Sequence, residues 1–237
     1  MTESEYWQSH TVLTNEVGDT ITSYYTEKEI DNYARESEAN FTRINADARF
    51  WLVTTHALRT TFMITLGRIF DHDQRSHSIR KLLNETVTHP EYFSKDRLAR
   101  RRYAGAGPEP VWLDEYIRNA WEPDVAGLGK LRNALAPSQA KYDEAFKLIR
   151  HKLYAHQDIM DRTSIQTLIG KGLITDLEKI LYDLHDVLSC IWQLANNGNE
   201  PKPGVSEYSY EQRIRLDTRA ALQRLIGSED NTSQALE

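Results

Sequence analysis

The sequence is poor in cysteine and lacks any long apolar run. Its one cysteine, Cys190, excludes an internal disulfide. The surrounding stretch VLSCIWQL predicts a small buried thiol and gives no support to thiol catalysis. No apolar run approaches the ~20 residues that cross a bilayer, and the polar start MTESEYWQSH does not resemble a signal peptide. We therefore expect a cytoplasmic protein with no membrane partner.

Motifs for metal, cofactor and nucleotide binding are missing as well. No HExxH or CxxC pattern occurs, and His151 and His156 are five residues apart, whereas helical metal ligands are usually spaced by four. No glycine-rich phosphate loop follows an expected strand. A short run of acids and histidines is more typical of a helix end and turn than of a metal site; it comprises Asp71, His72, Asp73 and His77. We expect neither a bound metal nor a cofactor.

An excess of acidic residues limits how the protein can meet nucleic acid. The chain carries a formal net charge of -6, and its pI is near 5.8. This negative net charge argues against nonspecific binding of long nucleic acid, because such binding depends mainly on the attraction between basic residues and phosphates. One local run is nevertheless strongly basic, and it contains Lys95, Arg97, Arg100, Arg101 and Arg102. We interpret it as a candidate contact for the RNA backbone, the alternative being a solvated helix face.

Apolar residues recur at helical spacing, and no alternating run of β-branched residues is long enough for a sheet. With 40% hydrophobic residues, the chain can bury a sizeable core. The longest periodic segments are 40–70 and 173–194, and shorter ones cover 78–87, 112–120 and 125–135. The sequence therefore predicts an all-α, multi-helix bundle.

Glycine and proline predict where helices are interrupted. Gly18 suggests that 4–38 forms one bent helix or two short ones. Pro137 predicts a break or a kink and suits the first turn of a new helix over 137–154. Four segments follow from this organisation, namely an N-terminal helical segment at 1–38, a helical bundle at 39–200, a C-terminal helix at 201–226 and a disordered tail at 227–237.

Strongly polar residues interrupt an apolar helical stripe in the stretch AFKLIRHKLYAHQD, at 145–158. Arg150 can hold a phosphate through two parallel hydrogen bonds. His156 can exchange protons near neutral pH, and His151 lies next to the arginine. Tyr154 is suited either to stacking on a base or to packing. Together, an arginine and a histidine are sufficient to cleave RNA through its ribose 2′-hydroxyl without a metal.

This stretch resembles the Arg-to-His signature of HEPN domains, and its end, YAHQD, is similar to their abortive-infection U-type (AbiU-like) branch. The stretch GRIFDHDQRSHSIRKLL, at 67–83, also resembles that branch. The resemblance covers about residues 40–195. It implies a helical and usually dimeric protein. Many such domains are metal-independent ribonucleases that act in phage defence or as toxins, and others are noncatalytic modules.

The spacing of the two motif residues requires a special arrangement. Six residues of straight α-helix advance about 9 Å and leave their side chains ~120° apart, so Arg150 and His156 of one helix cannot meet one phosphate. Either the helix ends before His156, or a homodimer brings two motifs together, as the resemblance implies. In that cleft His156 would act as general acid or base, and Arg150 would stabilise the phosphate charge. His151 fits the polar position of the family pattern.

We therefore expect an endoribonuclease that works as a homodimer on RNA, with a neutralising partner protein of the kind that toxins have. The alternative is a noncatalytic helical module that binds RNA or a partner protein. In that case Arg150 would be a surface residue, and His156 would favour the negative end of a helix. A plain helical interaction protein is the third hypothesis.

Overall fold

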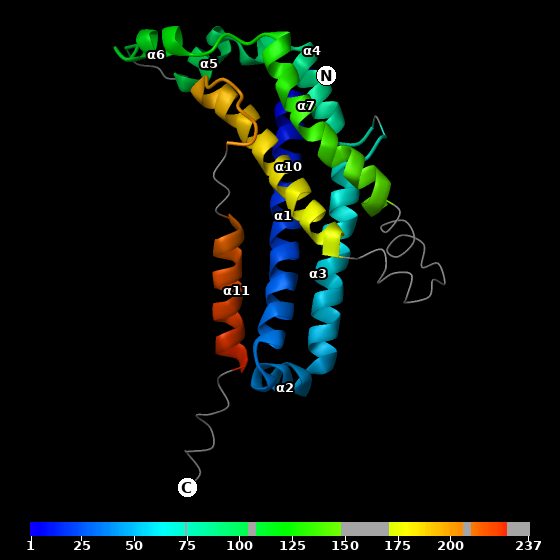
Figure 1. Ribbon diagram of the computed structural model, residues 1–237. Coiled ribbons are helices and arrows are strands. Elements are labelled where there is room, and N and C mark those ends of the chain that lie inside the picture. The colour runs from blue at the N-terminus through cyan, green and yellow to red at the C-terminus, as the bar shows by residue number, and fades with distance from the viewer. Residues whose placement is uncertain (74, 104–107, 148–170, 206–209, 227–237) are drawn as a thin grey trace. The chain divides into compact units, whose positions relative to one another are not determined.

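In the computed structural model, which describes residues 1–73, 75–103, 108–147, 171–205 and 210–226, every regular element is a helix (Figure 1). Within these ranges there are nine α-helices, one 3₁₀ helix and one π-helix, and no strand. The all-α prediction is confirmed for this part of the chain. None of its helices combines the length and the apolar character that a membrane span requires.

The contacts between residues divide the chain into two units. Helices α1 (Glu3–Glu36) and α3 (Ala48–Ile69) contribute residues to both. The first unit comprises Met1–Val17 and Gly67–Glu207, and the second comprises Gly18–Leu66 and Tyr208–Glu237.

Helix α10 (Lys171–Asn197) is central to the first unit. It contacts α7 (Val125–Lys141) and α5 (Lys95–Arg102), and Figure 1 shows it running beside α7. The predicted apolar stripe of this helix is buried, with Leu177, Ile180, Leu181, Leu184, Leu188 and Ile191 at most 5% exposed. Burial of each such side chain is worth about 1.5–3 kcal/mol. Trp192, which lies in the same periodic segment 173–194, is instead 50% exposed.

Three shorter elements complete the first unit. Helix α4 (Ile79–Thr88) packs on α7, and the 3₁₀ helix η1 (Pro90–Phe93) contacts α4, α5 and α10. Helix α6 (Leu113–Asn119) packs on α5. α5 itself begins at the N-cap Ser94, whose hydroxyl accepts the Arg97 N–H.

The second unit is built from parts of α1 and α3 with α2 (Glu38–Ala46) and α11 (Tyr210–Ile226). One cluster of its buried residues consists of Ile30, Tyr33, Ile44 and Leu222. An ion pair reinforces it, because the Arg219 guanidinium meets Glu29, which is only 4% exposed, at 2.8 Å. Burial of that carboxylate is tolerated because it is paired.

Helices continue through both positions at which we expected an interruption. Glu3–Glu36 forms a single helix of 34 residues with Gly18 inside it, so the alternative of two short helices is wrong. Gly18 costs roughly 1 kcal/mol relative to alanine in a helix interior, and buried Leu13, Val17 and Ile21 around it offset this cost. Pro137 likewise lies inside α7 and starts no new helix. Its side of α7 is exposed, so water can hydrate the carbonyl left without an N–H partner.

The long helix predicted over 40–70 is also wrong, because it is interrupted at Asp47. Asp47 ends α2 with φ -111° and ψ 39°, values outside the helical region, and α3 begins at the next residue. Residues before and after this break therefore do not share one face. Accordingly Phe41 and Leu52, one on each side of the break, are 55% and 68% exposed.

Gly198 allows a direct test of the packing at the end of α10. Its φ is +66°, and a Cβ there would lie 2.6 Å from Ala120 Cβ and 2.7 Å from Leu98 Cδ2. Gly204 also has a positive φ, +87°, but open space around its Cβ position. Both Gly→Ala substitutions carry a backbone strain of about 1–2 kcal/mol, and the clash at Gly198 adds about 1–3 kcal/mol.

Gly198→Ala should therefore lower the free energy of unfolding in urea more than Gly204→Ala does. Equal losses in the two variants would contradict this account of the packing at the end of α10.

His10 predicts a pH dependence of stability. It is 6% exposed, and its Nε2 lies 3.1 Å from the Leu188 carbonyl oxygen. Burial lowers the pKa of His10, and the Leu188 carbonyl opposes that shift. The unfolded chain therefore takes up the proton first as the pH falls. Stability should fall below about pH 6.5, and His10→Gln should flatten this dependence in unfolding curves measured from pH 7 to pH 5.

The matched control for His10 is His56→Gln, which removes an exposed imidazole on α3. It should leave the slope of stability against pH as in the wild type. Identical slopes in wild type and His10→Gln would show that His10 is not responsible.

Candidate functional site

The predicted catalytic residues Arg150, His151 and His156, with Tyr154, lie outside the described residues. Their roles stay predictions. The description ends at Lys147 before this motif and resumes at Lys171 after it.

The chain is firmly packed just before the motif. A π-helical turn, η2 (Tyr142–Phe146), follows α7 directly, and both of its aromatic residues are buried. The Tyr142 ring stacks on Phe70 at the end of α3, with 4.6 Å between ring centroids and 17° between planes. π-Helical turns within helices are rare and frequently occur at functional sites.

A polar cluster lies on the exposed side of this turn. His72 Nε2 is 3.2 Å from Asp143 Oδ1, and Arg80 Nη1 is 3.1 Å from His72 Nδ1. Because a guanidinium only donates, Nδ1 must accept, and the proton of the imidazole is then on Nε2 and donated to Asp143. Lys147 Nζ lies 3.9 Å from the same carboxylate oxygen. Asp143 thus joins a histidine and a lysine that flank the start of the motif segment.

The sequence placed His72 correctly but missed its partners. We interpreted 71–77 as a helix end and turn, and this stretch does lie between the end of α3 and the start of α4. The contact with Asp143 spans 71 residues and left no periodic signal. The resemblance of 67–83 to the AbiU-like branch was the one indication that this turn has a particular role.

Two arginines of the basic helix α5 serve to cap α10. Arg101 Nε donates to the Ala195 carbonyl at 2.9 Å, and its two Nη atoms donate to the Tyr92 carbonyl at 3.1 Å. Its guanidinium also lies 5.3 Å from the Trp7 ring centroid. Burial lowers the pKa of Arg101, although an arginine remains charged in any case.

Arg102 acts at the same end of α10. It donates to the Asn197 side-chain oxygen and, at 3.0 Å, to the Tyr116 hydroxyl. A positive charge near the last carbonyls of a helix is favourable, because the helix dipole is negative there. Arg101 and Arg102 therefore hold α5, α6 and the end of α10 together.

The other cations of α5 differ in their surroundings. Lys95 donates to the Arg118 carbonyl at 3.1 Å, and Arg97 pairs with Glu3 at 3.1 Å. Arg100 is exposed, and no contact of its guanidinium with another described residue is recorded. Of the predicted RNA-contact residues, Arg100 is thus the one with no internal role among the residues described. An RNA contact by this helix stays a prediction.

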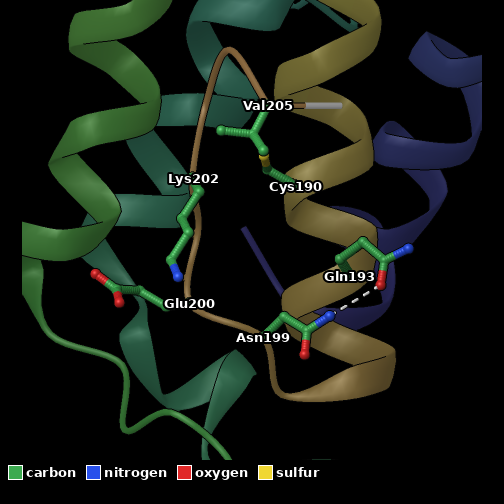
Figure 2. Close-up of a pocket in the computed structure, with 6 residues that line it drawn as sticks. All are labelled: Cys190, Gln193, Asn199, Glu200, Lys202 and Val205. Atoms are coloured by element: carbon green, nitrogen blue, oxygen red, sulfur yellow. Dashed lines mark hydrogen bonds between the residues drawn. The ribbon is translucent and has the colours of Figure 1, made fainter. Parts of the chain in front are cut away.

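An open pocket of about 370 Å³ lies between α10 and the segment that follows it (Figure 2). Burial raises the pKa of the Cys190 thiol to about 11, so it stays protonated near neutral pH. The predicted burial of the Cys190 thiol is confirmed, since Cys190 is 8% exposed. On the rim, Asn199 donates to the Gln193 side-chain oxygen at 3.2 Å. The lining residues are Cys190, Gln193, Asn199, Glu200, Lys202 and Val205.

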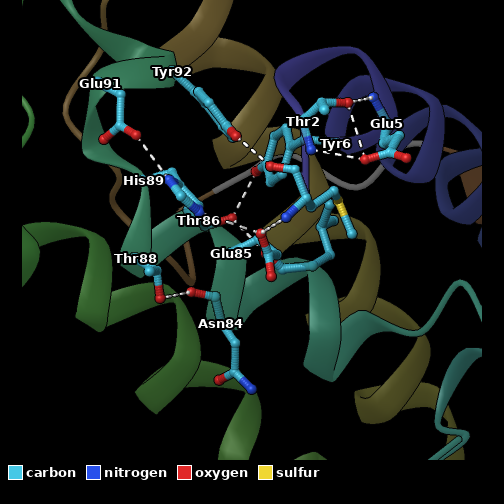
Figure 3. A network of polar contacts seen from close by, with 12 residues as sticks. Thr2, Glu5, Tyr6, Asn84, Glu85, Thr86, Thr88, His89, Glu91 and Tyr92 are labelled. Atoms are coloured by element: carbon cyan, nitrogen blue, oxygen red, sulfur yellow. Dashed lines mark hydrogen bonds and ion pairs between the residues drawn. The ribbon is translucent and has the colours of Figure 1, made fainter. Parts of the chain in front are cut away.

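A polar network joins α1 to α4 and η1 (Figure 3). The Tyr6 hydroxyl is 2.6 Å from the Thr86 hydroxyl, and the Tyr92 hydroxyl donates to the Met1 carbonyl at 2.6 Å. Glu85 pairs with the Met1 amino group at 3.2 Å. Burial strongly raises the pKa of Tyr6, which keeps the phenol neutral. We interpret this network as structural, because its buried groups are paired with one another.

Comparison with known proteins decides the family. The sequence model of the HEPN AbiU2 family matches residues 9–215. The chain belongs to the HEPN AbiU2 family. The match extends beyond the resemblance that we placed at residues 40–195, and it includes both α1 from Ser9 onwards and the Arg150–His156 stretch. Searches of curated proteins and of solved structures gave no match.

The caps on α10 lead to a stability prediction for this AbiU2-family protein. Arg101→Ala leaves the Ala195 and Tyr92 carbonyls without their donor, and each unsatisfied buried group costs about 1–3 kcal/mol. We expect a loss of at least about 2 kcal/mol in the free energy of unfolding. Arg101→Lys should recover part of it, because the ammonium keeps the charge but not the planar fork.

The matched control for Arg101 is Arg100→Ala, the same change at the adjacent exposed position, with an expected effect within about 0.5 kcal/mol. Both variants are compared with the wild type by urea unfolding. Equal stability of Arg101→Ala and Arg100→Ala would show that Arg101 does not act as a cap.

Proposed function

We propose that this AbiU2-family protein is a metal-independent endoribonuclease of the HEPN type, acting in phage defence or as a toxin. The observation that carries the proposal is the family match over 9–215, which contains an arginine and a histidine at the spacing of the HEPN signature. Its substrate would be intracellular RNA, and its proposed place of action is therefore the cytoplasm.

In the proposed mechanism, His156 takes the proton of the ribose 2′-hydroxyl as the 2′-oxygen attacks the phosphorus. The bond to the 5′-oxygen breaks, and a protonated histidine supplies the proton that this leaving oxygen needs. Arg150 stabilises the negative charge on the phosphate oxygens. The products are a 2′,3′-cyclic phosphate end and a 5′-hydroxyl end. Since Arg150 and His156 cannot meet on one straight helix, a homodimer that combines two motifs is part of the proposal.

The described structure supports the proposal in two ways. Tyr142 and Phe146 are buried immediately before the motif segment, which gives that segment a fixed starting point. The thiol of Cys190 is protonated near neutral pH because burial raises its pKa to about 11, so it offers no competing nucleophile.

A noncatalytic interaction module is the second candidate, and exposed apolar residues on α3 favour it. Phe50, Leu52 and Val53 are 59%, 68% and 69% exposed. Contiguous exposed apolar groups are typical of protein-binding surfaces. In such a module the motif would be retained without cleavage, and the chain would bind a partner protein.

The decisive experiment compares cleavage of a mixed RNA in EDTA by the wild type and by His156→Ala. We expect the wild type to produce fragments with cyclic phosphate ends, and His156→Ala to lose at least about 100-fold in rate, the usual contribution of an acid–base group. His56→Ala, an exposed histidine on α3, is the matched control and should cleave as the wild type does.

Equal cleavage by wild type and His156→Ala would rule out the proposed role of His156 and indicate a contaminating nuclease. Absence of cleavage by the wild type, with the protein folded as judged by circular dichroism, would favour the noncatalytic module instead.

A further inference from the structure

We infer that Arg80, positioned by His72 and joined by Lys147, forms a contact for an RNA phosphate beside the proposed cleavage motif. The inference rests on the proposed function and deepens it, since it names residues that would hold the substrate. It concerns a set of side chains different from the basic helix α5.

Three separate parts of the chain bring these groups together. His72 lies in the turn between α3 and α4, Arg80 is in the first turn of α4, and Lys147 directly follows η2. The Arg80 guanidinium is 3.1 Å from His72 Nδ1, and Lys147 Nζ is 3.9 Å from Asp143 Oδ1. His72 and Lys147 side chains are 41% and 57% exposed, so solvent, and hence a ligand, can reach them.

The guanidinium of Arg80 contacts a different kind of partner from those of the neighbouring arginines. Arg75 forms a paired contact with Asp73 at 2.7 Å, and Arg68 pairs with Glu16 at 3.0 Å. Arg80 instead donates to a neutral imidazole nitrogen, whose tautomer is set by Asp143. An imidazole holds the guanidinium in place without neutralising it. The remaining donors of that guanidinium can therefore meet an anion, for which its planar fork is well suited.

The acidic groups around the cluster are largely engaged. Asp143 is shared between His72 and Lys147. Asp73 is paired with Arg75, and one oxygen of Asp71 accepts the Asp73 N–H at 3.1 Å. Asp71 keeps its negative charge, because a backbone N–H does not neutralise a carboxylate, so the choice of ligand does not rest on net charge. We choose a phosphodiester because the donors of the Arg80 guanidinium that His72 does not use match two oxygens of a phosphate.

The position of Lys147 connects this cluster to the motif. Lys147 precedes Arg150 by three residues in the sequence. A phosphate held by Arg80 and Lys147 would therefore contact the residue at which the described chain stops before the motif. The α5 cations offer no such link, because Arg101 and Arg102 are engaged in capping α10.

The test measures RNA binding by the full chain carrying His156→Ala, so that cleavage does not interfere. A fluorescent single-stranded RNA of mixed sequence is titrated at several salt concentrations and followed by anisotropy. Addition of Arg80→Ala should weaken binding about five- to tenfold and reduce the slope of log K against log salt by about 0.7. Arg80→Lys should retain the slope but lose part of the affinity, since the ammonium cannot form the paired contact.

The matched control is Arg132→Ala, which removes the same charge from an exposed position on α7. It should change affinity less than twofold and leave the salt slope as in the parent. His72→Ala tests the positioning role. It should weaken RNA binding but reduce the slope of log K against log salt by less than Arg80→Ala does. The reason is that Arg80 keeps its charge and loses only the imidazole that positions it.

Equal affinities and slopes for Arg80→Ala and Arg132→Ala would overturn this inference and leave the ribonuclease proposal intact. No RNA binding by the parent protein would overturn the inference as well. Combined with a wild type that does not cleave RNA, that result would remove the proposed function itself. The urea midpoints of all variants show whether any loss reflects unfolding.

Discussion

The first unit depends on how the C-terminal end of α10 is closed. A helix end leaves carbonyl groups without partners, and burial of such groups is costly. Arg101 supplies donors to the Ala195 carbonyl of α10 and to the Tyr92 carbonyl of η1 while lying over the Trp7 ring of α1. One guanidinium thereby fixes three elements around the central helix. Gly198, with its positive φ, then turns the chain away where a side chain would collide with its neighbours.

This use of arginine changes how the charge of the protein should be interpreted. The most basic stretch of the sequence, Lys95–Arg102, places its last two arginines in contacts that stabilise the fold. Arg101, whose donors are directed to the Ala195 and Tyr92 carbonyls, has little left for a phosphate. Arg80 and Lys147, which we propose as RNA contacts, are held instead by a neutral imidazole and by a shared carboxylate. Membership of the AbiU2 family gives their location its functional meaning.

Periodicity predicted some elements well and others poorly, for identifiable reasons. α10 was anticipated because its apolar residues repeat every three or four positions over several turns, and most of them are buried in one core. The break at Asp47 was missed because α2 and α3 both have apolar residues at helical spacing, and a single non-helical residue between them leaves that spacing unchanged. Pro137 was overinterpreted, because a proline on an exposed helix face loses one hydrogen bond that water can replace.

The sequence by itself determined the class of the fold, the burial of Cys190 and the family, through the Arg150–His156 signature. These follow from local spacing and from residue identity, which need no knowledge of partners distant in the chain. Only the tertiary structure decided that Arg101 caps α10 and that His72 meets Asp143, 71 residues away. A hydrogen bond requires two atoms within about 3 Å, and which distant residues satisfy this condition depends on how the helices pack. The same arginine in the same sequence can be a cap or a ligand contact, and its neighbours in space make the difference.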